Sequence, residues 1–201
     1  MPQAMFHVKH EGPPPSLDEA QERALEAYGA LLTGRAVAAG MVSADDVLRL
    51  RERHLLDSLR AAVAVTSDDR DAYDVGSGAG LPGVVVAIAC PDLRVALVER
   101  RRSRAAFLEL VVDELRLPNA TVVPAGSERL AERVDVVFAR ALAPVRPAWA
   151  IAEPLLRPGG RLVYFAGEGF RPDVELPDDV RATLLSPSLA PSGPLVIMAR
   201  Q

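Results

Sequence analysis

The sequence has little cysteine, and its one thiol belongs to Cys90. A single cysteine cannot form a disulfide within the chain, and a lone thiol without a cysteine or histidine neighbour is a poor metal ligand. We therefore expect no metal site. We interpret Cys90 as a small buried residue of a protein that stays in the reducing cytoplasm.

Long apolar runs and an excess of positive charge are also missing. The longest apolar run covers residues 84–90, far fewer than the ~20 residues that a transmembrane helix needs. The N-terminal residues contain no apolar segment of a signal peptide. These absences predict a cytoplasmic protein without membrane contact. The formal net charge is −4, whereas proteins that hold nucleic acid mainly by charge are usually basic. Any contact with nucleic acid must then use a local patch.

Three regions are predicted along the chain. Residues 1–16 end in GPPPS, which favours a flexible, extended tail. Residues 17–66 carry apolar residues at helical spacing, and a second helix is expected to begin after Ser43. These residues predict an N-terminal helical cap. Residues 67–201 alternate short strands with helices and predict the core of the protein, which forms one structural domain with the cap.

The strand pattern of the core indicates an α/β fold. Strand–helix alternation favours a mostly parallel sheet. Two late strands near residues 182–185 and 195–198 lie too close together for a crossover helix. They predict an antiparallel strand at the edge of the sheet.

The stretch DVGSGAGLPG at residues 74–83 is rich in glycine and follows a predicted strand. Glycine can take positive φ and lets a ligand approach the main chain. A strand, a glycine-rich turn and a helix open the nucleotide-binding α/β folds. The dinucleotide fingerprint G-x-G-x-x-G would need a third glycine at Leu81, so a nicotinamide dehydrogenase is disfavoured. The G-x-G-x-G spacing favours S-adenosylmethionine (AdoMet), although a turn needed for packing alone is an alternative.

Two acidic residues support the AdoMet interpretation. Asp74 would be unwelcome beside a pyrophosphate, but it suits the cationic sulfonium and ammonium groups of AdoMet. Glu99 ends the next predicted strand, where an acid can accept hydrogen bonds from ribose hydroxyls. Together with the glycine turn, they predict an AdoMet site at this edge of the sheet.

Four stretches of the sequence resemble the bacterial 16S ribosomal RNA guanine-N7 methyltransferase family: ERHLLDSL at 52–59, DVGSGAGLPG at 74–83, DVVFARALAP at 135–144 and LRPGGRLV at 156–163. The resemblance implies a Rossmann-like class I AdoMet-dependent methyltransferase with a seven-stranded sheet. It also implies that AdoMet is used to methylate N7 of one guanine in 16S rRNA, within the small ribosomal subunit. We expect the enzyme to be a monomer.

Carried over residue by residue, the resemblance implies cofactor contacts at Gly76, Leu81, Glu99, Ser127, Glu128 and Arg140. The pattern of the glycine turn adds four further cofactor-binding residues: Asp74, Ser77, Gly78 and Gly80. Arg140 is expected near the point where the methyl group meets the base, and a structural salt bridge to Asp74 or Glu128 is its alternative role. Guanine N7 has a free lone pair, so no general base is expected. His54 and Asp57 either shape the entrance over the cofactor or fasten the cap helix to the core.

Arginines are dense between residues 100 and 104, and Arg101, Arg102 and Arg104 are predicted to bind RNA phosphates. A solvated helix start is the alternative. The aromatic pair Tyr164 and Phe165 either stacks on the base or belongs to the core.

Three basic positions of the family are altered in this sequence: Ser103, Gly126 and Ala166. These changes leave open a non-catalytic AdoMet-binding protein, or a methyltransferase that acts on a small molecule or a protein.

Overall fold

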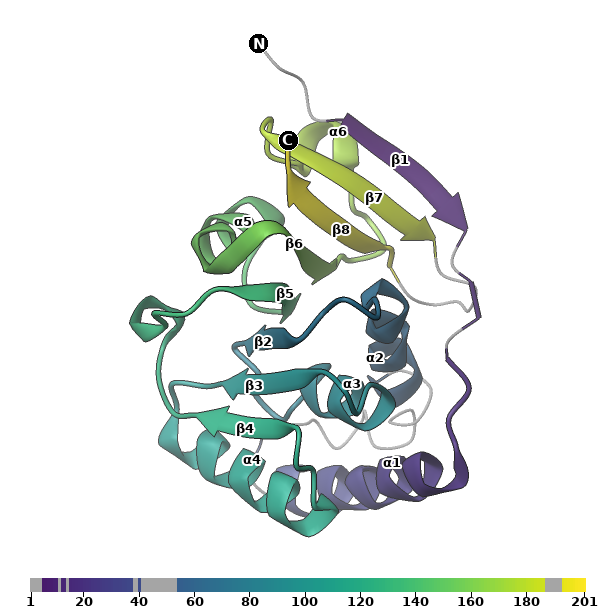
Figure 1. The fold of residues 1–201 in the computed structure, drawn as a ribbon, viewed down its shortest axis with the longest axis vertical. Helices are drawn as coiled ribbons and strands as arrows, with labels where there is room; N and C mark the ends of the chain where they lie inside the picture. Colours follow the sequence, from purple (N-terminus) through teal and green to yellow (C-terminus); the bar gives the residue numbers. More distant parts are fainter. Residues whose placement is uncertain (1–4, 11, 14, 38–39, 41–53, 187–192) are drawn as a thin grey trace.

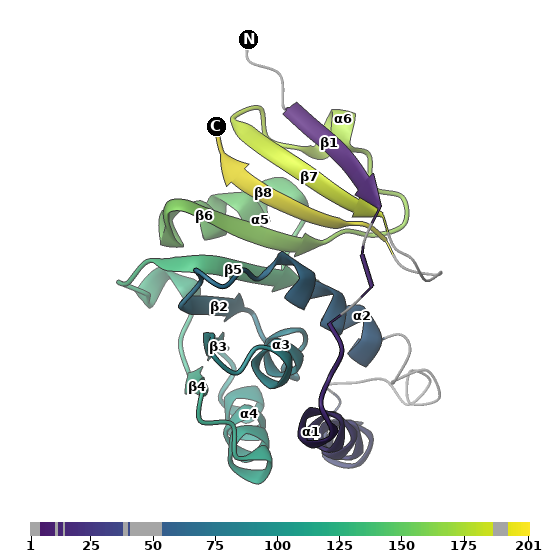
Figure 2. The same ribbon diagram turned by 45° about the vertical axis from the view of Figure 1, so that its right-hand side comes forward.

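Figure 1 shows a computed structural model that describes residues 5–10, 12–13, 15–37, 40, 54–186 and 193–201. One central sheet runs through the molecule, with helices on both of its faces (Figures 1 and 2). The predicted α/β, Rossmann-like fold is confirmed. No helix of the described residues is long and apolar enough to cross a membrane.

The sheet has eight strands, and their order is β1-β7-β8-β6-β5-β2-β3-β4. Every neighbouring pair is parallel except the two pairs that include β8. The strands are β1 Met5–His10, β2 Asp71–Val75, β3 Arg94–Val98, β4 Ala120–Val123, β5 Val134–Arg140, β6 Leu156–Phe165, β7 Val180–Ser186 and β8 Leu195–Arg200.

The chain changes direction across the sheet between β2 and β5. From β2 it proceeds outward through β3 to β4, and it then returns to place β5 on the other side of β2. In open α/β sheets, ligands bind at such a switch point, outside the carboxyl ends of the strands. The topology therefore identifies where to look for a site.

Two details of the sheet correct the sequence prediction. The composition of residues 1–16 predicts a flexible tail, but residues 5–10 pair in parallel with β7 and make an eighth strand. As a result the antiparallel strand β8 lies inside the sheet, between β6 and β7, and the edge is β1. The physical reason is that β7 would otherwise leave a row of backbone groups unpaired.

Most helices lie where apolar spacing predicts them. They are α1 Glu19–Leu31, α2 Asp57–Leu59, α3 Gly83–Ala89, α4 Arg102–Leu115, α5 Val145–Ala152 and α6 Pro172–Glu175. A capping box between Asp18 and Gln21 starts α1. The second predicted helix is seen from residue 54 onward, and it continues through a 3₁₀ segment at Arg60–Ala64. Its part from Ser43 to residue 53 lies outside the described residues.

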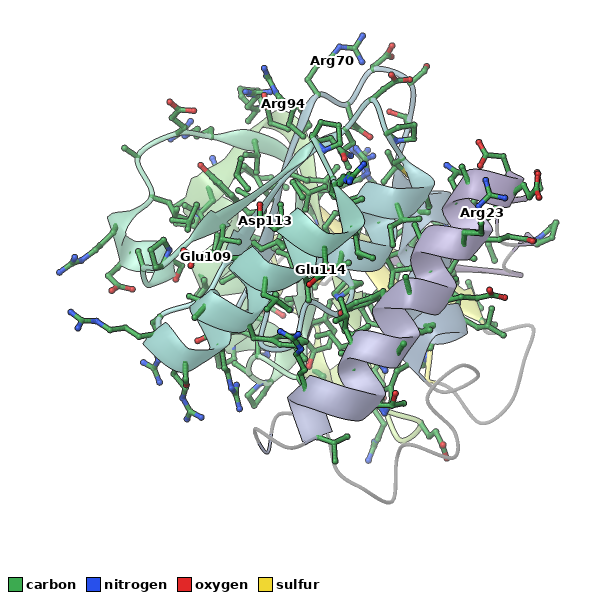
Figure 3. All side chains as sticks on the ribbon, turned by 90° about the horizontal axis from the view of Figure 1, so that it is seen from below. Arg23, Arg70, Arg94, Glu109, Asp113 and Glu114 are labelled. Atoms are coloured by element: carbon green, nitrogen blue, oxygen red, sulfur yellow. The ribbon has the colours of Figure 1, made fainter. Side chains whose placement is uncertain are left out.

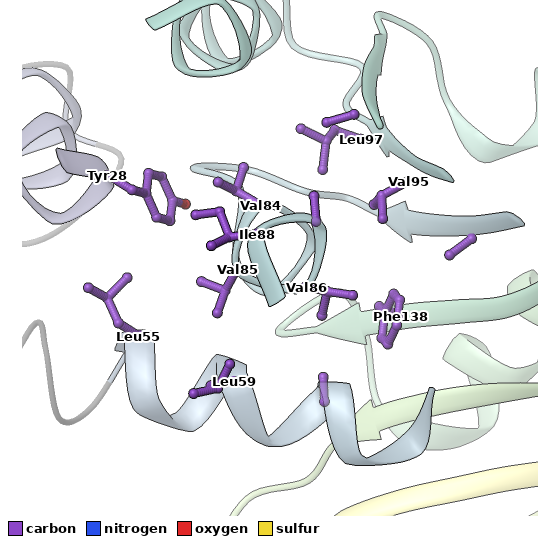
Figure 4. Packing of buried hydrophobic residues seen from close by; sticks show 14 of the residues in the cluster. Tyr28, Leu55, Leu59, Val84, Val85, Val86, Ile88, Val95, Leu97 and Phe138 are labelled. Carbon is purple, nitrogen blue, oxygen red and sulfur yellow. The ribbon is translucent and has the colours of Figure 1, made fainter. Parts of the chain in front are cut away.

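The predicted cap packs on one face of the sheet, over α3 and α4. We use "the cap" for its described residues, 17–37 and 54–66. Tyr28, Leu55 and Leu59 of the cap belong to the same buried cluster as the valines of α3 (Figure 4). A second cluster around Trp149 of α5 fills the opposite face. The charged side chains of α1 and α4, such as Arg23 and Glu109, are exposed on the outer surface (Figure 3).

A buried ion pair ties the cap to the amino ends of the strands. Arg161 of β6 pairs with Asp69, and its Nε donates to the carbonyl of Ala64 at 2.8 Å. Both side chains of the pair are largely buried. This pair lies at the end of the sheet opposite the switch-point cavity described below.

Candidate functional site

A cavity of about 630 Å³ lies at the carboxyl ends of β2, β3, β4 and β5, at the switch point of the sheet. Its volume falls in the range of sites that bind small molecules. It is lined by Val75, Gly76, Val98, Glu99, Arg100, Arg101, Arg104, Ala125, Gly126, Ser127, Glu128, Ala141, Leu142 and Ile151. We call this space the switch-point cavity.

The glycines of the turn after β2 have different surroundings. A Cβ on Gly76 would lie 2.7 Å from Leu142 Cδ1, so the main chain here is closely covered. A Cβ on Gly78 would meet its nearest atoms at 3.7 and 3.8 Å, which are ordinary contacts. Gly80 instead lies within the core, where a Cβ would be 2.6 Å from Val84 and 2.7 Å from the Tyr28 hydroxyl. Space beside the turn is therefore left at Gly78 and not at Gly80.

The cap contacts the glycine-rich turn after β2 through Tyr28. The buried Tyr28 of α1 donates its hydroxyl hydrogen to the carbonyl oxygen of Ala79 at 2.7 Å. Leu81, the predicted cofactor contact that follows, is partly buried against the same core cluster. The structure therefore joins the glycine turn to the cap, although it does not place Leu81 among the residues that line the switch-point cavity.

Glu99 joins the turn to the next strand end. Its carboxylate accepts hydrogen bonds from the backbone nitrogens of Gly78 at 3.1 Å and Arg101 at 2.8 Å. Although it is only 4% exposed, Glu99 lines the switch-point cavity. Each carboxylate oxygen has two lone pairs, so both can accept a further hydrogen bond from a ligand. The predicted position of this acid beside the turn is thus seen in the structure.

Asp74 has a different environment from Glu99. It is 1% exposed, and its Oδ2 accepts hydrogen bonds from Ser77 Oγ at 2.6 Å and from the backbone nitrogen of Gly83 at 3.0 Å. Neither Asp74 nor Ser77 is among the residues that line the switch-point cavity. A direct contact of either residue with a cofactor stays a prediction, while their role in shaping the turn is visible.

Burial raises the pKa of Asp74 from its ordinary value of 3.8 to about 6. The folded protein therefore binds this proton more tightly than the unfolded chain does. Its contribution to stability is complete below pH 4 and is lost as the pH rises through 6, by on the order of 3 kcal/mol.

We expect Asp74→Asn to remove this pH dependence, because one amide oxygen can still accept both hydrogen bonds and no charge is buried. Urea unfolding should show that the variant gains stability relative to the native protein as the pH rises from 4.5 to 7.5. A difference between the two proteins that does not change with pH would contradict the assignment.

Arg140 ends β5 and is mostly buried beneath the cap. Its Nη2 pairs with Asp57 Oδ2 at 3.0 Å, and its Nη1 donates to Ser58 Oγ at 2.8 Å. The guanidinium also lies over the ring of Phe165, 5.3 Å from the ring centre. The salt bridge considered from the sequence is present, but its partner is Asp57 rather than Asp74 or Glu128.

Of the two roles predicted for His54 and Asp57, these contacts favour fastening the cap helix to the core. Asp57 pairs with Arg60 at 2.7 Å as well as with Arg140. His54 Nδ1 lies 3.4 Å from Arg140 Nη2. Both residues therefore fasten the cap through Arg140. Tyr164 donates to the carbonyl of Ala143 at 3.0 Å and so supports the segment after β5.

The arginines after β3 differ in their exposure and in whether they line the switch-point cavity. Arg101 and Arg102 are exposed, whereas Arg104 is half-buried, with Nη1 3.8 Å from the position of a Cβ on Gly78. Arg101 and Arg104 line the switch-point cavity and Arg102 does not. The structure thus brings Arg104 to the glycine turn, which its place in the sequence cluster did not reveal.

At the far side of the cavity, Ser127 and Glu128 form a 3₁₀ turn after β4. The Glu128 carboxylate occupies the space that a side chain on Gly126 would need. Glycine at this altered position thus leaves Glu128 room to fold back. Of the other two altered positions, Ser103 is exposed and Ala166 is packed among buried residues.

Leu142 lines the switch-point cavity and was missed by the sequence analysis, although it lies within the stretch DVVFARALAP. An apolar residue in a segment chosen for its arginine gives no signal of its own. Its position over Gly76 depends on the conformation of the preceding Ala141, which has a φ of 51°. In the described residues, no group of three or more metal-ligating side chains lies together.

Comparison with known proteins gives one consistent family. A family model described as rRNA small subunit methyltransferase G matches residues 21–184. A protein from Acidiphilium cryptum named ribosomal RNA small subunit methyltransferase G is 41% identical over 148 residues, which cover 72% of this chain and 68% of that protein. A protein of the same name from Corynebacterium diphtheriae is 36% identical over 183 residues, covering 85% and 79%. For a relative from Thermobifida fusca the alignment spans 63% of its length.

Solved structures show the same fold at low identity. An O-methyltransferase from Bacillus cereus in complex with SAH has a TM-score of 0.56 and 17% identity, and the match covers 93% of this chain and 92% of that one. A ribosomal protein L11 methylase from Lactobacillus delbrueckii has a TM-score of 0.58 and 12% identity, with coverage of 74% and 79%. These similarities support the fold, and at such low identity they do not identify the substrate.

Proposed function

Because the chain belongs to the rRNA small subunit methyltransferase G family, we propose that it transfers the methyl group of AdoMet to N7 of one guanine in 16S rRNA. The activity of the family is methyl transfer to ribosomal RNA of the small subunit. The choice of guanine N7, the residues that bind the donor and the form of the substrate are the parts that we propose.

The observation that supports this proposal most directly is the switch-point cavity. It brings together Gly76 after β2, Glu99 after β3 and Glu128 after β4. We place the ribose at Glu99, whose oxygens can accept hydroxyl hydrogens, and the adenine beside Gly126 and Glu128. The methionine part then lies toward Gly76 and the end of β5.

The chemistry requires alignment rather than proton transfer. Guanine N7 carries a lone pair in the plane of the ring, so it can attack the methyl carbon without losing a proton. A bond from N7 to carbon forms as the carbon–sulfur bond breaks, and the electron pair stays on sulfur. When bound, AdoMet supplies an activated methyl group. The protein holds the two reactants in line, which can supply much of the rate enhancement.

The RNA is proposed to approach over the exposed arginines after β3. Arg101 and Arg102 are exposed next to the cavity, and their charges can contact phosphates. The net charge of −4 limits such contacts to a patch. We propose that the substrate is rRNA in the small ribosomal subunit, whose folded surface adds recognition by shape. We also propose that the enzyme acts as a monomer in the cytoplasm.

Transfer of tritium from labelled AdoMet to small ribosomal subunits tests the proposal. The subunits come from a strain that lacks the gene, and matched subunits from the parent strain serve as the control because their guanine is already methylated. Borohydride–aniline cleavage followed by reverse transcription then locates N7-methylguanine. We expect label at a single guanine in the deficient subunits. AdoMet binding without transfer to either subunit would favour a non-catalytic or re-targeted protein instead.

A further inference from the structure

The carboxylate of Asp57 lies between two buried arginines. Its Oδ1 is 2.7 Å from Arg60 Nη1, and its Oδ2 is 3.0 Å from Arg140 Nη2. The side chains of Asp57, Arg60 and Arg140 are 12%, 8% and 17% exposed. Asp57 begins α2 of the cap, which Figure 2 shows beside the end of β5. The contact therefore joins the cap to the strand end from which Ala141 and Leu142 enter the switch-point cavity.

The guanidinium of Arg140 is fixed from more than one direction. Ser58, the next residue of α2, accepts a hydrogen bond from its Nη1 at 2.8 Å, and the ring of Phe165 lies beneath it. A planar guanidinium with a fixed fork of donors is sensitive to such a geometry. Two neighbouring residues of one cap helix thus set both the position and the plane of the Arg140 head group.

Arg60, the second arginine beside Asp57, connects Asp57 to the neighbouring strands. Arg60 Nη1 also donates to the carbonyl of Gly193 at 3.1 Å, just before β8. Gly193 is pressed against the chain after β6, because a Cβ on it would collide with the carbonyl of Ala166. Asp57 is therefore connected to the ends of β5 and β6 and to the start of β8.

We propose that Asp57 is a positioning residue for methyl transfer, which holds Arg140 and the end of β6 so that the guanine meets the donor in line. This inference rests on the proposed function. Removing one partner of a buried ion pair destabilises a protein whether or not the pair has a further role, so a lower melting temperature alone does not distinguish positioning from fastening. The alternative, an ion pair that fastens the cap and nothing more, makes a different prediction.

The pair of Asp69 and Arg161 provides the matched control. It is a second buried aspartate–arginine pair, its arginine is also 17% exposed, and that arginine donates to the carbonyl of Ala64 in the cap. It lies at the amino ends of the strands, away from the switch-point cavity. Asp69→Asn and Asp57→Asn should therefore both lower the melting temperature. They differ in which end of the sheet they disturb.

The experiment measures single-turnover methylation of deficient small subunits at saturating AdoMet, together with the Kd for AdoMet and the melting temperature. For Asp57→Asn we expect the rate to fall about 100-fold, the loss associated with a misplacement of about 1 Å, with the Kd unchanged. Asp69→Asn should keep the native rate. Ser58→Ala removes one hydrogen bond to Arg140 without removing a charge, and it should slow transfer about 10-fold, even if Asp57→Asn fails to fold.

The outcomes separate the two proposals. Native rates in folded Asp57→Asn and in Ser58→Ala would overturn the positioning role and leave the proposed function standing. A large loss of AdoMet affinity in Asp57→Asn would also overturn it, because the residue would then act on donor binding. If the native protein binds AdoMet and labels no subunit, the proposed function fails, and the positioning role fails with it.

Discussion

Gly78→Asp is expected to abolish AdoMet binding while the protein stays folded. A Cβ at this position makes ordinary contacts, and the φ of 61° is one that aspartate tolerates. The Cβ would lie 3.8 Å from Nη1 of Arg104, a side chain that lines the switch-point cavity, so we expect the added carboxylate to project toward the space that we assign to the donor. Calorimetry should show affinity weakened by at least about 100-fold, or about 3 kcal/mol, with a native circular dichroism spectrum.

Gly159→Asp is the matched control for this variant. Gly159 also has positive φ, and nothing lies within 4 Å of a Cβ placed on it. It lies within β6, close to the register shift between β5 and β6, among the residues of a separate pocket with Arg133 and Arg157. The control should bind AdoMet with native affinity. Micromolar binding retained by Gly78→Asp would refute the placement of the donor against the turn.

Gly80→Ala is expected to destabilise the protein strongly, although it adds one methyl group. The φ of 101° is strained for alanine, and the new carbon would lie 2.6 Å from Val84 Cγ2 and 2.7 Å from the Tyr28 hydroxyl. Relief of the clash would break the hydrogen bond from Tyr28 to Ala79. Strain, overpacking and the lost hydrogen bond together should cost on the order of 4 kcal/mol.

Chemical denaturation of Gly80→Ala and Gly78→Ala measures this difference. The two substitutions are identical and lie two residues apart in one turn, so their effects on the unfolded chain are similar. Gly78→Ala should be only mildly destabilised, because no atom lies closer than 3.7 Å to its Cβ. Equal losses of stability in both variants would show that the turn, and not the packing against Tyr28, sets the cost.

These two predictions show what a glycine pattern can and cannot reveal. The spacing of Gly76, Gly78 and Gly80 predicts a turn after a strand, and the structure confirms it. The same spacing does not tell which glycine has open space beside it and which lies within the core. That difference depends on Tyr28 and Leu142, which come from distant parts of the chain.

The two acidic residues of the site also show that the sequence pattern does not reveal the surroundings of a side chain. Asp74 and Glu99 both lie at the ends of predicted strands, and the sequence pattern predicts that both contact the cofactor. Their environments diverge because Asp74 is turned toward Ser77 and the start of α3, while Glu99 is turned toward the switch-point cavity. A strand alternates its side chains between two faces, but the direction of a residue at a strand end depends on the turn that follows.

The partner of Arg140 could not be predicted from local sequence. The stretch ERHLLDSL and the arginine after β5 were both identified, yet nothing in either stretch indicates that Asp57 and Ser58 contact that arginine. The contact arises because the helix of the cap lies across the carboxyl end of β5. Elements with strong periodicity were predicted well, whereas contacts between them required their arrangement in space.

The pairing of β1 with β7 has a consequence for how the chain folds during its synthesis. Met5 is paired with Arg181, so β1 is synthesised long before the strand with which it pairs. Closing such a long loop is slow compared with forming local contacts. Until β7 emerges, residues 5–10 have no strand with which to pair, and a nascent chain in this state is open to pairing with the wrong edge. Translation speed and chaperone supply should therefore affect the yield of this protein.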